Sequence, residues 1–103
     1  MVTTVREPIV IEDWQVKPVD PIKELALKVA EALDDPGRWT AFRLHDGDRR
    51  CAMGHAVCIS ADLERAIELS IAFVGFNGHS MQHVNDYDGR LAVQAALRDF
   101  GNS

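Results

Sequence analysis

Hydrophobic residues recur at helical spacing in several stretches of the chain. The first stretch follows Asp20, a residue type that caps helix N-termini, and Pro21, which suits the first position of a helix. Its apolar positions are Ile22, Leu25, Ala26, Val29, Ala30 and Leu33. Pro36 disfavours a helical conformation at the preceding residue, and Gly37 favours a turn. The pattern therefore predicts a helix that begins at Pro21 and ends by Asp35.

Three more helical patterns follow. The residues around Cys51 fall on two faces of a predicted helix. Gly54 lies in this helix and indicates that a neighbouring segment packs closely against it. Ser60 is the expected N-cap of a helix over residues 61–74, which Gly75 and the Phe76-Asn77-Gly78 turn would end. Its apolar stripe consists of Leu63, Ala66, Ile67, Ser70, Ile71 and Val74. After a polar loop over residues 79–88, a last helix carries Ala92, Val93, Ala96, Leu97 and Phe100 on one face.

One segment between the first two helices favours strands instead. Residues 38–44 contain Trp39, Thr40, Phe42 and Leu44, which suit a strand. Asp46-Gly47 is a two-residue hairpin signal, and residues 48–52 would form the returning strand. A chain of 103 residues is long enough for one domain. We therefore expect an α+β fold: one domain over residues 20–100, with about four helices, a short β-hairpin, and a frayed tail over residues 101–103.

Residues 1–19 form a separate N-terminal arm in this prediction. The arm is rich in β-branched residues, includes Pro8 and Pro18, and lacks helical periodicity, so it is expected to be extended or to form one or two short strands. Its expected interaction residues are Val5, Ile9, Ile11 and Trp14. An unpaired apolar segment favours association, with a partner protein or with a second copy. The alternative is that the arm folds back over its own helices as a lid.

Composition narrows the setting. Hydrophobic residues make up 47% and charged residues 26% of the chain, which is typical of a folded globular protein. The sequence contains no run of about 18 apolar residues, so no membrane-spanning helix is predicted. Residues 1–12 lack the layout of a secretory signal. Two cysteines are too few for a disulfide framework, so we expect a cytoplasmic protein, in the host cytoplasm if a phage encodes it.

Charge is unevenly distributed along the chain. The formal net charge is −5, which opposes binding to nucleic acid, yet residues 38–58 carry a net +2. Within this basic island Arg43, Arg49 and Arg50 flank the predicted hairpin tip, and Trp39 or Phe42 could stack on a base. The arginines are thus candidates for weak nucleic-acid binding, although a solvated hairpin with core aromatics explains them more simply.

Cysteine and histidine residues raise the question of a metal site. Cys51, His55 and Cys58 could bind zinc with His45, His79 or His83 as a fourth ligand. On one straight helix, however, Cys51 and Cys58 lie about 10.5 Å apart along the axis, too far to share a zinc ion or form a disulfide. We therefore expect no metal and no cofactor, keep Cys51, His55, His79 and His83 as weak candidate ligands, and expect both cysteines in the core.

An enzyme could use the same residues in another way. A cysteine nucleophile could be served by His83, with Asn85 or Asp86 orienting the imidazole, but no local signature supports that arrangement. Asn85, Asp86 and Asp88 could also act as a general base or bind a metal. Their simpler interpretation is structural, since such residues form turns and cap helices. We expect no catalytic residues and no enzymatic activity.

Three short motifs stand out along the chain: residues 35–40 (Asp-Pro-Gly-Arg-Trp-Thr), residues 51–56 (Cys-Ala-Met-Gly-His-Ala) and residues 84–86 (Val-Asn-Asp). In this order and at this spacing they resemble a family of small uncharacterised actinobacterial and actinophage proteins, a domain of unknown function. The resemblance covers about residues 22–100, and Met53, His55 and Val84 depart from the residues usual in the family. It implies an architecture and a phage or actinobacterial origin, and no activity.

The function expected from the sequence is that of a protein-interaction module. It would bind a host factor or associate with itself through the arm. The first alternative is a small metal- or cysteine-dependent enzyme. The second is a weak nucleic-acid binder that uses Arg43, Arg49 and Arg50.

Overall fold

The computed structural model describes residues 20–103, and the predicted arm lies outside this range. Helix α1 (Pro21–Ala32) begins where the sequence predicts: an Asp20 carboxylate oxygen accepts a hydrogen bond from the Ile22 amide at 2.9 Å. Its far end is held by helix α5 (Arg90–Gly101), where Arg90 donates to the Leu33 carbonyl and Gln94 to the Ala30 carbonyl, both at 2.8 Å. These bonds satisfy carbonyl groups that a helix C-terminus leaves without a partner.

The β-hairpin is confirmed, but its strands are shorter than predicted. Strands β1 (His45–Asp46) and β2 (Arg49–Arg50) pair antiparallel around Gly47, which has a φ of 64°. The strand expected over residues 38–44 is wrong, because the 3-10 turn η2 (Pro36–Arg38) and a series of bends take its place. Phe42 adopts a left-handed φ of 65°, which is incompatible with an extended strand.

Helices α2 (Ala52–Ser60) and α3 (Leu63–Asn77) follow the hairpin. The N-cap of α3 is Asp62 and not Ser60 as predicted: Asp62 accepts from the amides of the second and third helical residues, whereas the Ser60 hydroxyl bonds the Ala56 carbonyl at 2.7 Å. Helix α3 continues past Gly75 and ends at Gly78, which has a φ of 89°. Gly75 is thus an ordinary helix-interior position.

The polar loop predicted over residues 79–88 is wrong for residues 81–88, which are helical. They form the short helix α4 (Met81–His83) and the π-helix η3 (Val84–Asp88) before α5 begins. The many polar residues of this segment hide its helical periodicity in the sequence. Its residues Met81, Val84 and Asn85 are nevertheless buried. Gly89 lies at the N-cap position of α5, where no side chain caps the helix. The expectation that Asp86 or Asp88 caps this helix is therefore wrong.

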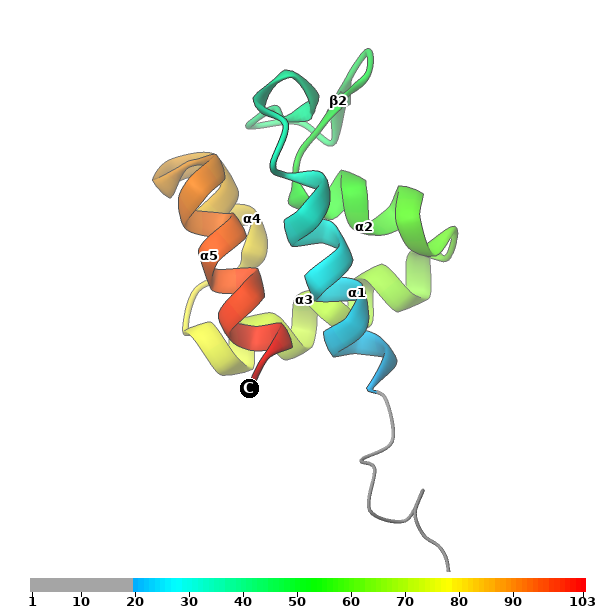
Figure 1. Ribbon diagram of the computed structural model, residues 1–103, viewed down its shortest axis with the longest axis vertical. Coiled ribbons are helices and arrows are strands. Elements are labelled where there is room, and N and C mark those ends of the chain that lie inside the picture. Colours follow the sequence, from blue (N-terminus) through cyan, green and yellow to red (C-terminus); the bar gives the residue numbers. More distant parts are fainter. Residues whose placement is uncertain (1–19) are drawn as a thin grey trace, which may run out of the picture.

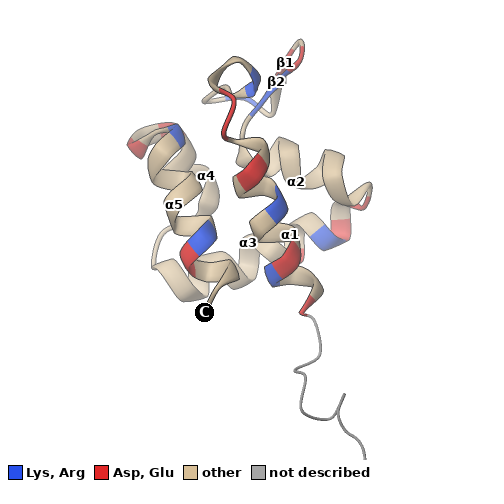
Figure 2. Ribbon diagram, in the orientation of Figure 1, with Lys and Arg blue, Asp and Glu red and all other residues tan. Residues whose placement is uncertain are grey.

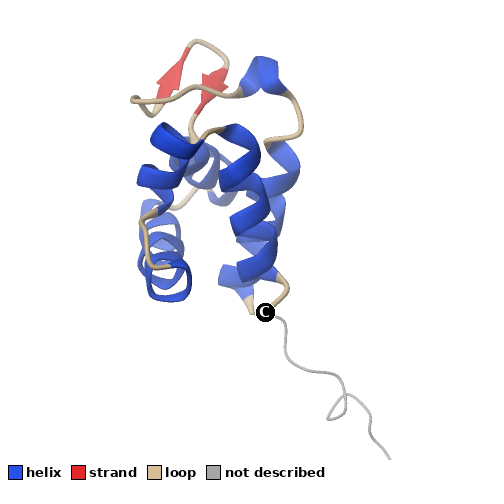
Figure 3. Ribbon diagram, turned by 90° about the vertical axis from the view of Figure 1, so that its left-hand side faces the viewer, coloured by secondary structure: helices blue, strands red, loops and turns tan. Residues whose placement is uncertain are grey.

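The helices pack around one core. Figure 1 shows α1 between α5 and α2, with α3 crossing below them, and Figure 3 shows the two strands at one end of the domain. The core includes the predicted apolar faces of α1 and α5, and its largest fully buried side chains are Phe73, Leu33, Leu69, Met81 and Leu97. Five α-helices and a two-stranded sheet within residues 20–103 confirm the α+β class. In this range no helix combines the length and apolar character needed to cross a membrane.

Candidate interaction surface

Asn85 is the centre of a buried polar network that joins three segments. Its Oδ1 accepts hydrogen bonds from Trp39 Nε1 at 2.8 Å and from the Ala52 amide at 3.0 Å. Its Nδ2 donates to the Thr40 carbonyl at 3.1 Å and to Asp86 Oδ1 at 2.9 Å. The amide therefore uses both donors and both acceptor positions, which identifies Asn85 as a structural residue.

Trp39 and Asp86 complete this network. The Trp39 ring is partly buried and packs against the core, while its nitrogen reaches Asn85. The Asp86 carboxylate also accepts the Phe42 amide at 2.8 Å, which fixes the left-handed residue in the hairpin segment. Through these two hydrogen bonds Asp86 holds Asn85 and Phe42 in place, which agrees with the structural interpretation of the Asn85-Asp86 pair.

Cys51 and His55 are buried, and neither is arranged to react with the other. The Cys51 sulfur accepts the Gly54 amide at 3.3 Å as the N-cap of α2, and burial raises the pKa of its thiol. A carbonyl can only accept, so His55 Nε2 donates to the Arg38 carbonyl at 2.8 Å, and burial lowers the pKa of this imidazole. A raised thiol pKa disfavours the thiolate that a nucleophile or a zinc ligand requires.

The other candidate metal ligands are dispersed. Cys58 is exposed, which corrects the expectation that both cysteines lie in the core. His79 and His83 stack on each other at the surface with ring centroids 5.0 Å apart. Within residues 20–103 no group of three or more His, Cys, Asp or Glu side chains is placed to hold a metal ion.

An aromatic series runs from this histidine pair to the hairpin segment. His83 contacts Tyr87 with ring centroids 5.1 Å apart, and Tyr87 meets Phe42 edge to face at 5.4 Å. Phe42 and Tyr87 are 65% and 71% exposed. The rings rest on one another, so this surface is preorganised, and Asp86 and Asp88 on the same π-helix give it an acidic surrounding.

The basic island keeps its predicted place at the hairpin. Arg49 forms an ion pair with Asp46 across the turn, so one of the three candidate arginines is neutralised locally. Arg43 is exposed, and Arg50 is half-buried. Figure 2 shows basic and acidic segments interspersed at the hairpin and on α1.

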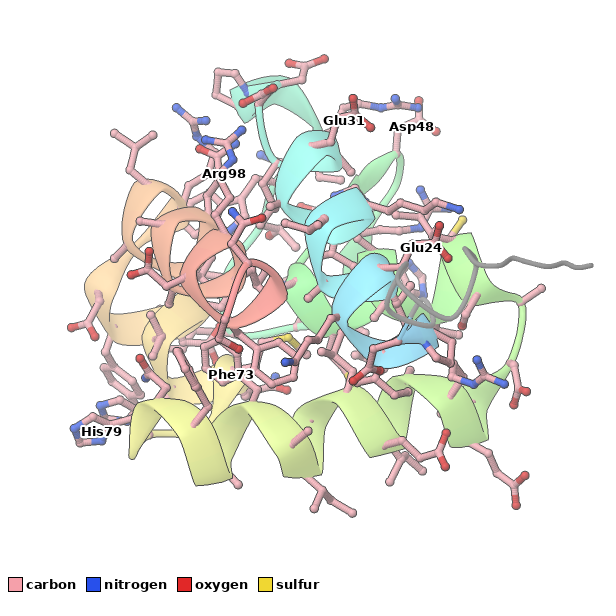
Figure 4. The ribbon with its side chains drawn as sticks, turned by 60° about the horizontal axis from the view of Figure 1, so that its bottom comes forward. Glu24, Glu31, Asp48, Phe73, His79 and Arg98 are labelled. Atoms are coloured by element: carbon pink, nitrogen blue, oxygen red, sulfur yellow. The ribbon has the colours of Figure 1, made fainter. Side chains whose placement is uncertain are left out.

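The clearest surface feature is an apolar face of α3 that points away from the core. The helix buries Ala66, Leu69 and Phe73, and Figure 4 shows Phe73 directed toward the other helices while further α3 side chains project from the opposite side. The opposite side carries four large aliphatic residues, here called the α3 stripe: Leu63 (60% exposed), Ile67 (43%), Ile71 (65%) and Val74 (41%). Of the residues that the sequence pattern assigned to one stripe, only Ala66 is fully buried.

A groove lies beside Leu63, the first residue of the α3 stripe, on the side of α2 and the hairpin. Its volume is about 240 Å³, and Leu63 belongs to both the stripe and the groove. The residues that line this groove, here called the hairpin groove, are Leu44, His45, Arg50, Gly54, Val57, Cys58 and Leu63. A Cβ on Gly54 would collide with the Leu44 carbonyl oxygen and would lie 3.1 Å from Arg50 Cβ. The close neighbour expected from Gly54 is therefore the hairpin, and their approach forms the groove.

The sequence contains a signal for this exposed face of α3. The apolar positions of α3 include both the core set and the α3 stripe, so they cover a wider arc of the helix than one packed face needs. The interaction residues expected in the arm, Val5, Ile9, Ile11 and Trp14, lie outside the described residues.

No family model, curated protein or solved structure matches this chain. The resemblance to the actinobacterial and actinophage family therefore remains an expectation.

Proposed function

We propose that the protein is an interaction module that binds another protein chain through the α3 stripe. The observation that carries this proposal is the exposure of four large aliphatic side chains on one face of one helix. Single exposed apolar residues are common on soluble proteins, whereas contiguous ones typically belong to binding surfaces.

The α3 stripe is not needed to fold the helix. Helix α3 already buries Ala66, Leu69 and Phe73, and both of its ends are capped, by Asp62 and by Gly78. A polar outer face would serve folding equally well, because charged and polar residues normally occupy the solvent side of such a helix. Apolar residues at these positions are therefore better explained by binding than by stability.

The hairpin groove supports the same function. It lies beside Leu63 and is lined largely by apolar atoms, so a partner on the stripe could insert a side chain there. Binding energy in protein interfaces concentrates where a side chain fills such a depression. The stripe and the groove together match the helix-in-groove mode of recognition.

The alternatives receive less support. An enzyme based on Cys51 would need a thiolate that burial disfavours, and His55 is occupied by the Arg38 carbonyl. A nucleic-acid binder based on Arg43, Arg49 and Arg50 would have to overcome a net charge of −5, with Arg49 already paired to Asp46. We therefore propose a non-enzymatic, cytoplasmic protein whose partner is a host protein or a second copy. Whether the arm residues Val5, Ile9, Ile11 and Trp14 contribute remains a prediction.

Photo-crosslinking tests this function inside cells. A photoreactive residue replaces Ile71 in the stripe or, as the control, Leu91 on α5, because both positions are 65% exposed. The proposal predicts a protein adduct from position 71 and little from position 91. Equal adducts, or none from position 71, would contradict it.

A further inference from the structure

We infer that the chain covering the α3 stripe is a second copy of this protein, with the two α3 helices packed parallel about a two-fold axis. This inference depends on the proposed function and names the partner of the same surface. Two observations carry it: the self-complementary apolar spacing of the stripe, and the opposite charges on its two sides.

The spacing suits a symmetric pair. The α3 stripe repeats at intervals of four, four and three residues, which keeps its members on one face of a helix with 3.6 residues per turn. Helix α3 has 15 residues, so it is about 22 Å long, and the stripe extends over most of that length. A two-fold axis places the same patch on both subunits and so matches apolar surface with apolar surface.

The charges beside the stripe decide the orientation. At about 100° per residue, the exposed acids Glu64 and Glu68 lie on the side of the stripe away from the buried residue Leu69. The hairpin groove, with Arg50 and His45, adjoins the stripe at Leu63 on the opposite side, where α2 packs. A two-fold axis parallel to α3 brings the acidic side of each copy against the basic side of the other. An axis perpendicular to α3 would instead bring the two acidic sides together, where like charges repel.

The same axis keeps residues at equal heights along the helix. Arg50 and Leu63 both line the hairpin groove, so Arg50 lies near the N-terminal end of α3 and would meet the partner near the level of Glu64. Within residues 20–103 neither Arg50 nor Glu64 forms an ion pair, whereas Glu68 pairs with Arg65. Two symmetric pairs between Arg50 and Glu64 are therefore available to the parallel arrangement.

The first experiment measures the association of the full-length chain by sedimentation equilibrium up to millimolar concentration. The expected result is a dimer that Ile71→Glu weakens at least about ten-fold, since it places two charges in an apolar interface. Leu91→Glu is the matched control and leaves the dimer unchanged. A wild-type chain that is monomeric at every concentration overturns the inference.

The second experiment tests the orientation by exchanging charges. Glu64→Arg and Arg50→Glu should each weaken the dimer about five-fold, because each places like charges opposite one another across the interface. The double variant should restore the dimer, because the two exchanged charges again attract. Thermal melting of each variant confirms that it is folded. A dimer that needs the stripe but is not restored in the double variant overturns the parallel arrangement.

The inferred dimer and the proposed binding function can fail separately. A monomeric chain that is crosslinked from position 71 to a different protein overturns the dimer and leaves the proposed function intact. A monomeric chain without any adduct from position 71 overturns both.

Discussion

The indole nitrogen of Trp39 donates a hydrogen bond to Asn85 Oδ1 at 2.8 Å, although 46 residues separate the two in the chain. Through the same oxygen Asn85 holds the N-terminus of α2, and through its nitrogen it holds the Thr40 carbonyl. One side chain thus fixes the segment after α1, the start of α2 and the π-helix before α5. The hairpin that borders the groove is positioned by this network.

Asn85→Ala should lower the free energy of unfolding by about 3 kcal/mol or more, because it leaves several buried donors and acceptors without a partner. Urea unfolding measures the effect. The matched control is Asn77→Ala, since the Asn77 amide makes a single exposed hydrogen bond at 3.5 Å to the His79 carbonyl. The control should change the unfolding free energy by less than about 0.5 kcal/mol. Equal effects of the two substitutions would refute the central role of Asn85.

Two substitutions of Trp39 separate its ring from its hydrogen bond. Trp39→Phe keeps most of the packing, removes the donor to Asn85, and should cost about 1–3 kcal/mol. Trp39→Ala should cost about 3–5 kcal/mol, toward the lower end because the ring is only half-buried. In a double-mutant cycle with Asn85→Ala, the Trp39→Phe effect should be strongly non-additive. Wild-type melting of Trp39→Ala would instead assign Trp39 to a binding surface.

Gly54 and Gly75 should respond to alanine with opposite signs. At Gly54 a Cβ would collide with the Leu44 carbonyl, so Gly54→Ala should destabilise the protein by about 1–3 kcal/mol. At Gly75, in the interior of α3, a Cβ meets nothing within 4 Å, so Gly75→Ala should stabilise by about 0.5–1 kcal/mol. Thermal melting of the two variants checks both signs. Stabilisation by both would show that the hairpin does not pack on Gly54.

His55 should make stability depend on pH. Burial lowers its pKa below the ordinary value of 6.5, so on acidification the unfolded chain takes up the proton before the folded chain does. The stability from neutral His55 is therefore complete above about pH 6.5 and is lost as the pH falls through the folded-state pKa. Unfolding free energies measured between about pH 7.5 and about pH 5 should fall less in His55→Gln than in the wild type. Parallel curves would contradict this role.

Much of the fold follows from local signals in the sequence. Asp20-Pro21 begins α1 because a carboxylate caps the free amides and proline needs no partner there, and the apolar faces of α1 and α5 are buried as their spacing predicts. The Asp46-Gly47 pair predicts the hairpin locally as well, because Gly47 adopts the left-handed conformation that the turn needs. These features depend on a few neighbouring residues.

The errors concern long-range interactions. Residues 81–88 are polar enough to predict a loop, yet they are helical because Met81, Val84 and Asn85 are buried against distant segments. The pairing of Asn85 with Trp39 has no local signal. On α3, periodicity alone could not decide which of two apolar faces enters the core, and the packing of Leu69 and Phe73 leaves the other face outside.

The central claim is that the α3 stripe serves binding to another chain and not the folding of its own domain. The most direct measurement is urea unfolding of the Ile67→Glu/Ile71→Glu double variant, at concentrations too low for association. The account predicts an unfolding free energy within about 0.5 kcal/mol of the wild type, because both side chains face outward from α3. The core substitution Leu69→Ala, as a control, should cost about 2–5 kcal/mol. A loss in the double variant as large as in the control would mean that the chain itself covers this face, and would contradict the account.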